Sequence, residues 1–435
     1  MPEHPEAFGF VVLEVVMFRF TPYTAIQQSI FAHRQRSSVA FRSVAFRFYT
    51  WRVEKPKETP KYKVLFFGTD EFSASHLKAL IQEKKQPDSC IASIDLVCPP
   101  DQMTGRKRNI LTPAATKGLA ELYNIPVHHT PPRAETLDNW EVPGKFDLGV
   151  VVSFGYFIPP KVIESFEKGA INVHPSLLPK FRGAAPIQHT ILRGEGETGV
   201  TIQELDDKEF DAGRILAQQK VDLSEDNAPR FKDLRDRLSI VGQHILVDTL
   251  RNFDECKRLA KPQDPNAITK APKIKKEWAE IDFENMESWQ IEQLHRAIGE
   301  QVLQKYIQMQ MFNIFIPEDS PIYHEQTPPE PGQFIFEDAT KTLHVACADG
   351  NAIAFTHIKA DSKDTISVKD FVNGYEIHGG YGQFGVFDED YVKPGKSGVR
   401  VTKRRHEYAK SIRKRLGMRR FEYDYHYHGK TSGRR

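Results

Sequence analysis

Short apolar runs that alternate with helix-like segments constrain the fold of this chain more than any other feature. The runs cover residues 62–67, 94–98, 146–154 and 170–173. They have the length of strands, and their nearly continuous apolar character is typical of parallel strands covered on both faces. Gly68 ends the first run and a helical pattern follows it, as in the opening unit of a doubly wound sheet. We therefore predict a Rossmann-like α/β domain over residues 61–261.

A second, smaller domain is predicted after this one. Helical periodicity over residues 111–123 and 231–253 belongs to the first domain, whereas residues 262–272 contain three prolines and no periodicity, which indicates a linker. Beyond the linker we predict one helix over residues 288–297 and several short strands. These strands cover residues 334–336, 343–347 and 352–355. Their spacing favours a small OB-like β-barrel over residues 273–378.

The net charge is distributed unevenly along the chain. There are 60 Lys and Arg residues against 58 Asp and Glu residues, a formal net charge of +2. Residues 1–53 carry a net charge of +3, residues 54–395 carry −12 and residues 396–435 carry +11. An acidic body repels polyanions overall, so a nucleic-acid partner would have to bind a local basic surface.

The two ends are predicted to be appendages. Residues 17–53 are Arg-rich, contain Ser and lack acids, which is typical of a mitochondrial transit peptide and predicts a location in the mitochondrial matrix. We assign residues 1–53 to this peptide, with Met17 as an alternative start and a basic arm without a targeting role as the alternative reading. Residues 379–435 are predicted to be a disordered or partly helical basic tail. It would bind RNA, dock on an acidic partner or have no role.

Several classes of protein are disfavoured. The four Cys residues lack the spacing of a disulfide framework or a zinc site, and no stretch reaches the roughly 18 apolar residues that a membrane span needs. Gly68 stands alone, without the three-glycine dinucleotide fingerprint, and no Walker A pattern occurs. We therefore expect no metal, no nicotinamide or flavin cofactor and no membrane association.

The main chemical motif lies at the end of the fourth apolar run. Asn172 and His174 are two residues apart on a predicted strand, so both side chains point to the same face at its carboxyl end. An amide and an imidazole side by side suit the stabilisation of an oxyanion during acyl transfer. The alternative is a purely structural histidine. Ser176 lies nearby but without the G-x-S-x-G motif of a nucleophile elbow, so a hydrolase is the weaker interpretation.

This motif carries a family resemblance. The segment INVHPSLLPKFRGAAPIQ at residues 171–188, with VTI at 200–202 and FDAG at 210–213, resembles the 10-formyltetrahydrofolate-dependent formyltransferases. The similarity extends over residues 63–374, from KVLFFGTDEFSASHLKAL to ISVKDFVNGY. It implies an enzyme that transfers the formyl group of 10-formyltetrahydrofolate to the amino group of initiator methionyl-tRNA and needs no metal. Together with the predicted transit peptide, this gives a role in mitochondrial translation initiation, and we expect a monomer. Two alternatives stay open: formyl transfer to a small amine or amino sugar, and a non-catalytic RNA-binding protein on the same fold.

The resemblance also implies roles for particular residues. Asn172, His174 and Asp211 would be the catalytic residues. This chain has one residue more than the usual bacterial pattern between Val200 and Asp211. Three neighbouring acids therefore remain alternatives to Asp211, namely Asp206, Asp207 and Glu209. The folate would contact Phe154, Gly155, Tyr156, Ser176, Leu177, Leu178 and Pro179.

Two basic segments resemble the regions with which the family contacts tRNA. The first is the loop that contains Arg106, Lys107 and Arg108, and the second is the start of the C-terminal domain with Lys273, Lys275 and Lys276. Successive cations of this kind suit phosphate contacts. The alternatives are an ordinary solvated loop and a charged linker.

Overall fold

The computed structural model describes most of the chain between residues 61 and 384. The described ranges are 61–104, 109–132, 136–206, 208–224, 228–299, 305–306, 309–360, 364–374, 377 and 380–384. The predicted transit peptide and nearly all of the predicted basic tail lie outside them. No helix within these ranges is long and apolar enough to cross a membrane.

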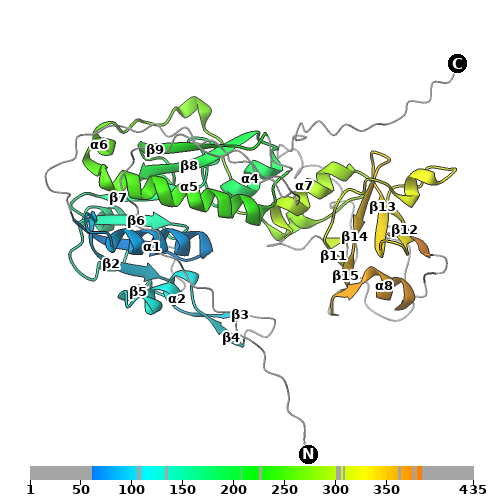
Figure 1. Ribbon diagram of the computed structural model, residues 1–435, viewed down its shortest axis with the longest axis horizontal. Coiled ribbons are helices and arrows are strands. Elements are labelled where there is room, and N and C mark those ends of the chain that lie inside the picture. Colours follow the sequence, from blue (N-terminus) through cyan, green and yellow to red (C-terminus); the bar gives the residue numbers. More distant parts are fainter. Residues whose placement is uncertain are drawn as a thin grey trace, which may run out of the picture. The chain divides into compact units, whose positions relative to one another are not determined.

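A seven-stranded mixed sheet forms the centre of the first domain (Figure 1). Its strands are, in spatial order, β5 (Val127–His129), β2 (Ile91–Cys98), β1 (Tyr62–Gly68), β6 (Leu148–Val152), β7 (Ala170–His174), β8 (Glu197–Glu204) and β9 (Ile215–Asp222). The first five are parallel. Four of them, β2, β1, β6 and β7, correspond to the predicted apolar runs, whereas β5 was not predicted. β8 is antiparallel to β7, although the helix Pro186–Leu192 lies between them along the chain. β9 is antiparallel to β8, because a direct turn joins this pair in place of a helical crossover. The predicted α/β domain is confirmed, with one antiparallel edge added.

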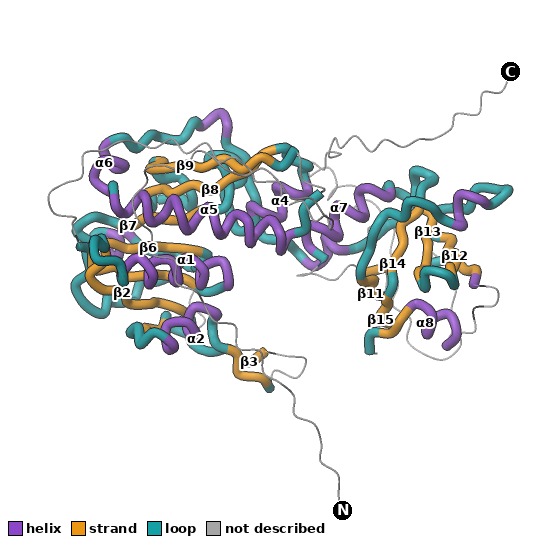
Figure 2. The backbone as a smooth tube through the Cα atoms, viewed as in Figure 1, coloured by secondary structure: helices purple, strands orange, loops and turns teal. Residues whose placement is uncertain are grey.

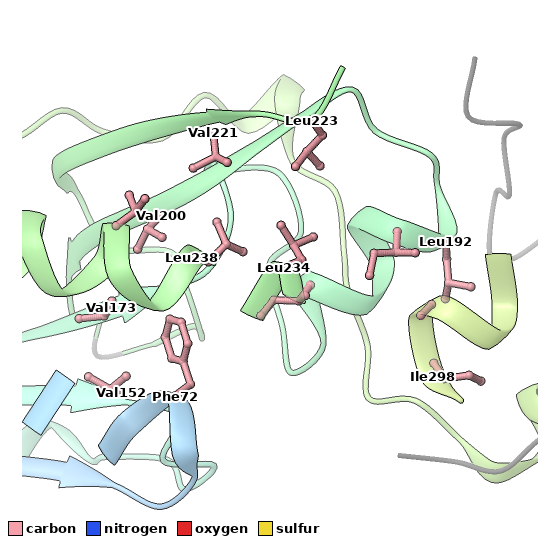
Figure 3. Packing of buried hydrophobic residues seen from close by; sticks show 14 of the residues in the cluster. Phe72, Val152, Val173, Leu192, Val200, Val221, Leu223, Leu234, Leu238 and Ile298 are labelled. Atoms are coloured by element: carbon pink, nitrogen blue, oxygen red, sulfur yellow. The ribbon is translucent and has the colours of Figure 1, made fainter. Parts of the chain in front are cut away.

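Apolar side chains cover the sheet on both faces. Val64 and Phe66 of β1 belong to one buried cluster, and Leu65 and Phe67, which alternate with them, belong to another. The first cluster includes residues of helices α1 (Glu71–Lys84), α2 (Ala115–Leu122), α4 (Pro186–Leu192) and α5 (Phe231–Arg251). Figure 3 shows Phe72 of α1 beside strand residues Val152 and Val173. Helix α3 (Pro160–Ile163) packs with the second cluster, and α6 (Phe253–Arg258) follows α5.

One predicted helix begins later than expected. The periodicity predicted a helix from residue 111, but Ile110–Thr112 forms strand β4, which pairs with β3 (Gln102–Thr104), and α2 begins at Ala115. Pro113 explains the difference, because a proline disfavours helical backbone at the preceding residue. The result is a short hairpin on either side of the basic loop.

The second domain consists of antiparallel strands, as predicted. Its strands form two four-stranded sheets (Figure 2). The first contains β10 (Lys305–Tyr306), β11 (Met309–Phe312), β15 (His357–Ala360) and β16 (Ile366–Ser367), and the second contains β14 (Ala352–Phe355), β13 (Thr342–Ala346), β12 (Gln333–Glu337) and β17 (Tyr381–Gln383). The helical elements here are η2 (Lys276–Ala279), α7 (Ser288–Ile298), η3 (Pro321–His324) and α8 (Val368–Gly374). The three predicted strands and the predicted helix correspond to β12, β13, β14 and α7.

Helix α7 packs on the first domain. Gln293 Nε2 donates a hydrogen bond to the Ile191 carbonyl of α4, with an N···O distance of 2.7 Å. Leu192 of α4 and Ile298 of α7 belong to the same apolar cluster (Figure 3). The segment between α6 and η2, predicted as a linker, contains the short helix η1 (Pro265–Ala267).

Candidate active site

Strand β7 places Asn172 and His174 next to each other on one face of the sheet. His174 is the last residue of the strand and is only 4% exposed. Across the antiparallel pair, Asn172 lies opposite Gln203 of β8 and His174 lies opposite Thr201. Cross-strand partners share a face, so four polar side chains gather at the carboxyl end of β7.

The turn between β8 and β9 brings Asp211 to these residues. Its Oδ1 accepts hydrogen bonds from Asn172 Nδ2 at 3.3 Å and from Gln203 Nε2 at 3.1 Å. Its Oδ2 accepts one from the backbone N–H of Gly183 at 2.9 Å. His174 Nδ1 lies 3.6 Å from Oδ1, and both side chains are largely buried. The three predicted catalytic residues therefore lie together.

The acids considered as alternatives to Asp211 have other contacts. The carboxylate of Asp206 accepts the backbone N–H groups of Lys208 and Glu209, each at 2.9 Å. Glu209 pairs with Lys270 at 2.7 Å, and this hydrogen bond holds the pKa of the Glu209 carboxyl below its ordinary value. Asp207 lies outside the described residues. Among the described acids of this turn, Asp211 is the one that faces His174.

The other ring nitrogen of His174 also has a partner. Nε2 lies 3.0 Å from the carbonyl oxygen of Phe181 and donates to it. The ring is thereby held between a backbone carbonyl and a carboxylate. Beside it stands the Asn172 amide, whose second N–H remains available to a substrate oxygen. The arrangement can stabilise a developing oxyanion and move a proton without a covalent intermediate.

The loop after β7 contains the four residues predicted to contact folate, and internal hydrogen bonds fix its shape. Ser176 Oγ donates to the Lys180 carbonyl at 2.7 Å, so this hydroxyl is engaged within the loop. Thr201 Oγ1 accepts from the Leu178 N–H at 3.1 Å and donates to the Ser176 carbonyl at 2.7 Å. Ser176 and Leu178 are buried, whereas Leu177 and Pro179 are partly accessible.

The other predicted folate segment follows β6. Phe154 is a core residue that is 4% exposed, with its ring centroid 5.2 Å from that of Phe67. Gly155 is exposed and has a φ of +76°, and a side chain placed there would meet nothing within 4 Å. Tyr156 is half-buried and packs against Phe154. Gly155 and Tyr156 are thus open to a ligand, and the buried ring of Phe154 packs against Tyr156 on the core side.

The predicted tRNA contacts are only partly described. Arg106, Lys107 and Arg108 lie outside the described residues, as does the side chain of Lys276. The hairpin that flanks the basic loop exposes three apolar side chains, Met103, Ile110 and Leu111. Lys273 and Lys275 are exposed at the start of the second domain.

Several polar residues of the site were not predicted from the sequence. Gln203 and Thr201 alternate with buried Val200 and Ile202 in β8, and polar residues at every second position of an apolar strand are a signal that would have found them. Gln263 and Arg182 also contribute to the site. Arg182 lies within the family motif at residues 171–188, whereas no sequence pattern marks Gln263. Within the described ranges, no group of three or more His, Cys, Asp or Glu side chains is placed to bind a metal ion.

Comparison with known proteins defines the class as a two-domain formyltransferase. Residues 62–250 match the sequence model described as formyl transferase, and residues 273–376 match that described as formyl transferase, C-terminal domain. The chain belongs to the formyltransferase family and is therefore a formyl-transfer enzyme.

The relatives narrow this class further. The chain is 35% identical to the methionyl-tRNA formyltransferase of Listeria monocytogenes, over 72% of this chain and 95% of the relative. It is 32% identical to the mitochondrial methionyl-tRNA formyltransferase of Rattus norvegicus, over 76% of this chain and 82% of the relative. A solved N-formyltransferase from Helicobacter canadensis, in complex with folinic acid and dTDP-3-aminofucose, is 17% identical with a TM-score of 0.46. That likeness covers 67% of this chain and 98% of the other.

Proposed function

We propose that the protein transfers the formyl group of 10-formyltetrahydrofolate to the amino group of methionyl-tRNA. The observation that carries this proposal is the convergence of Asn172, His174 and Asp211 at the carboxyl end of β7. Relatives at 32% and 35% identity are named methionyl-tRNA formyltransferases, and both family domains are present. They support this acceptor over a small amine.

The proposed chemistry begins with attack by the amino nitrogen on the formyl carbon. A new C–N bond forms, and the carbonyl electron pair moves onto the formyl oxygen. Asn172 Nδ2 and the Nδ1–H of His174 would donate to that oxyanion, while His174 Nε2 stays on the Phe181 carbonyl; such donors are typically worth about 3–4 kcal/mol each. Both groups are already fixed, Asn172 by Asp211 and His174 by Phe181, so little reorganisation is needed.

The second step returns the electron pair and breaks the bond from the formyl carbon to N10. The amine must lose a proton and N10 must gain one. The Asp211 carboxylate would accept the proton of the amine, and the imidazole of His174 would give one to the leaving nitrogen. Because Asp211 Oδ1 lies 3.6 Å from His174 Nδ1, the proton could then return from the carboxylate to the imidazole. Asp211 would thus act both as a base and as the group that orients Asn172.

The substrates would bind on either side of this trio. Gly155 and Tyr156, with Phe154 below them, and the loop of Ser176, Leu177, Leu178 and Pro179 would hold the folate. Residues 106–108 and the lysines 273, 275 and 276 would contact tRNA phosphates. The catalytic domain would then be residues 61–261, with a linker at 262–272 and a tRNA-binding β-domain at 273–378.

The mitochondrial location is part of the proposal. It rests on the Arg-rich, acid-free composition of residues 17–53 and on mitochondrial relatives such as the rat protein. Bacterial relatives are equally similar, so the composition of residues 17–53 is the main support. Residues 1–53 fused to a fluorescent protein should direct it to mitochondria. The same fusion with Arg34→Glu and Arg36→Glu should stay outside, because import needs a cationic amphipathic segment.

Substrate comparison tests the proposed function. Purified protein, 10-formyltetrahydrofolate and methionyl-tRNA should yield formylmethionyl-tRNA, whereas a nucleotide-linked amino sugar should give no product. Formylation of the sugar without formylation of methionyl-tRNA would replace the proposed acceptor with a small amine. Absence of transfer to both would support the non-catalytic alternative.

A further inference from the structure

The segment between α6 and η2 is bound to the active-site loops rather than free. We call residues 261–271 the strap. At one end, Lys261 and Ile215 exchange two backbone hydrogen bonds, of 2.8 and 3.0 Å. At the other end, the backbone N–H of Arg182 donates to the carbonyl of Thr269 at 2.9 Å, and the carbonyl of Arg182 accepts from the N–H of Ala271 at 2.7 Å. The strap therefore spans from the start of β9 to the loop that follows His174.

Gln263 reaches from the strap into the turn that contains Asp211. Its Nε2 lies 2.8 Å from the carbonyl oxygen of Asp211, 2.8 Å from that of Gly213 and 3.1 Å from Gln203 Oε1. The two amide hydrogens are thus shared among acceptors on both sides of the turn. Gln203 in turn donates to the Asp211 carboxylate.

The carbonyl end of Gln263 is equally engaged. Its Oε1 accepts from Nε of Arg182 at 2.9 Å and from Nη2 at 2.8 Å. Arg182 is 6% exposed, so its fork of donors needs protein acceptors. Gln263 therefore connects a buried cation on one side to the Asp211 turn on the other.

Asp211 needs such support because of its backbone conformation. Its φ is +59°, a left-handed value that a non-glycine residue keeps only when its surroundings stabilise it. Relaxation of this residue would move the carboxylate away from Asn172 and His174. Gln263 binds the backbone carbonyl of Asp211 itself, so this hydrogen bond acts directly on the strained residue.

We propose that Gln263 is a positioning residue, which keeps Asp211 in its left-handed conformation and thereby keeps the carboxylate at His174 and Asn172. The consequence for catalysis rests on the function proposed above. The segment that leads to the second domain then supplies one side chain, Gln263, that supports the active site.

Two substitutions in the full-length protein separate the two ends of the side chain. Gln263→Met removes all its hydrogen bonds at similar volume. Gln263→Glu keeps an acceptor for Arg182 and loses the donors to the two carbonyls. Asp264→Ala is the matched control, because Asp264 lies in the same strap but its carboxylate accepts from the N–H of Asn266, at the start of η1, and not from the residues of the site.

Two readouts are required. The first is steady-state kinetics with both substrates, and the second is hydrogen exchange of the Gly183 amide, which donates to Asp211 Oδ2. Both Gln263 variants should lower kcat at least about tenfold while each KM stays within about threefold, because a misplaced catalytic group slows chemistry more than binding. Gly183 exchange should accelerate by about tenfold or more in both, and Asp264→Ala should change neither readout.

The outcomes are distinguishable. Wild-type kcat and wild-type Gly183 exchange in folded Gln263 variants would overturn the proposal. A fall in kcat that merely follows the folded fraction, seen by circular dichroism, would also overturn it, because that is a structural effect alone. Failure of the wild-type protein to formylate methionyl-tRNA would refute the proposed function instead, while Gly183 exchange would still report whether Gln263 positions Asp211.

Discussion

At the scale of single residues, the place of some residues in the site could be predicted from the sequence, whereas that of others could not. Asn172 and His174 could be predicted to share a face because they are two apart on an apolar strand, and β7 confirms this. Asp211 could be named only through family resemblance, because periodicity does not govern where a turn residue lies. Gln263 was missed because it meets Asp211 from a segment 52 residues further along the chain.

His76 predicts how stability depends on pH. It is fully buried in α1, where Nδ1 donates to the Phe72 carbonyl at 2.7 Å, and burial lowers its pKa to about 4. The unfolded chain, with an ordinary pKa of about 6.5, therefore binds a proton between pH 6.5 and 4 that the folded protein does not. The free energy of unfolding should fall by roughly 3 kcal/mol as the pH is lowered through this window.

Urea unfolding at pH 7.0 and pH 4.5, compared between the wild type and His76→Met, measures this contribution. The difference between the two pH values should be smaller in the variant. Equal pH dependence in both proteins would show that His76 is not the group responsible.

At the scale of elements, apolar periodicity predicted most strands and helices. It failed where a proline or long-range contacts determine the local structure. Pro113 delays the start of α2, and the antiparallel pairing of β9 with β8 follows from the turn that joins them directly. The strap appeared only as a proline-containing segment without periodicity. Its partners are loop carbonyls and amides that no local pattern indicates.

Gly183 tests how closely the strap approaches the site. Its φ is +125°, and a Cβ there would lie 2.6 Å from the carbonyl oxygen of Ala271 in the strap. Gly183→Ala should cost on the order of 1–3 kcal/mol of stability and displace the N–H that binds Asp211. The melting temperature and kcat should both decrease.

Gly196→Ala is the matched control for this substitution, because a Cβ at this exposed glycine meets nothing within 4 Å. It should leave the melting temperature and kcat close to those of the wild type. A Gly183→Ala protein as stable and as active as Gly196→Ala would contradict the observed approach of the strap.

At the scale of the whole molecule, the formal net charge of +2 conceals an acidic body between two basic ends. Attraction of tRNA by the total charge is therefore weak, and binding would depend on local basic surfaces. The sequence predicts which segments are basic, because charge runs can be read from it directly. The sequence does not predict how these basic segments are arranged in space. Residues 106–108 and the segment 396–435 also lie outside the part of the chain that the structure describes.

The exposed lysines of the second domain give a prediction at this scale. Lys273→Glu and Lys275→Glu together should raise KM for methionyl-tRNA and leave KM for the folate unchanged. Each lost phosphate contact should reduce the slope of log affinity against log salt by about 0.7–0.9.

Deletion of residues 396–435, measured in parallel, should likewise raise KM for methionyl-tRNA and reduce the salt slope if the tail binds RNA. An unchanged salt slope in the double lysine variant would remove these lysines from the tRNA surface.

The central claim is that Asn172, His174 and Asp211 carry out formyl transfer, and single-turnover formylation of methionyl-tRNA tests it most directly. With saturating folate and enzyme in excess, His174→Ala and Asp211→Asn should each slow product formation by about 10²–10³-fold relative to the wild type, because each removes a group that acts in the transition state. Both variants should still bind the folate. Rates within about threefold of the wild type in both would contradict the assignment of these residues as the active site.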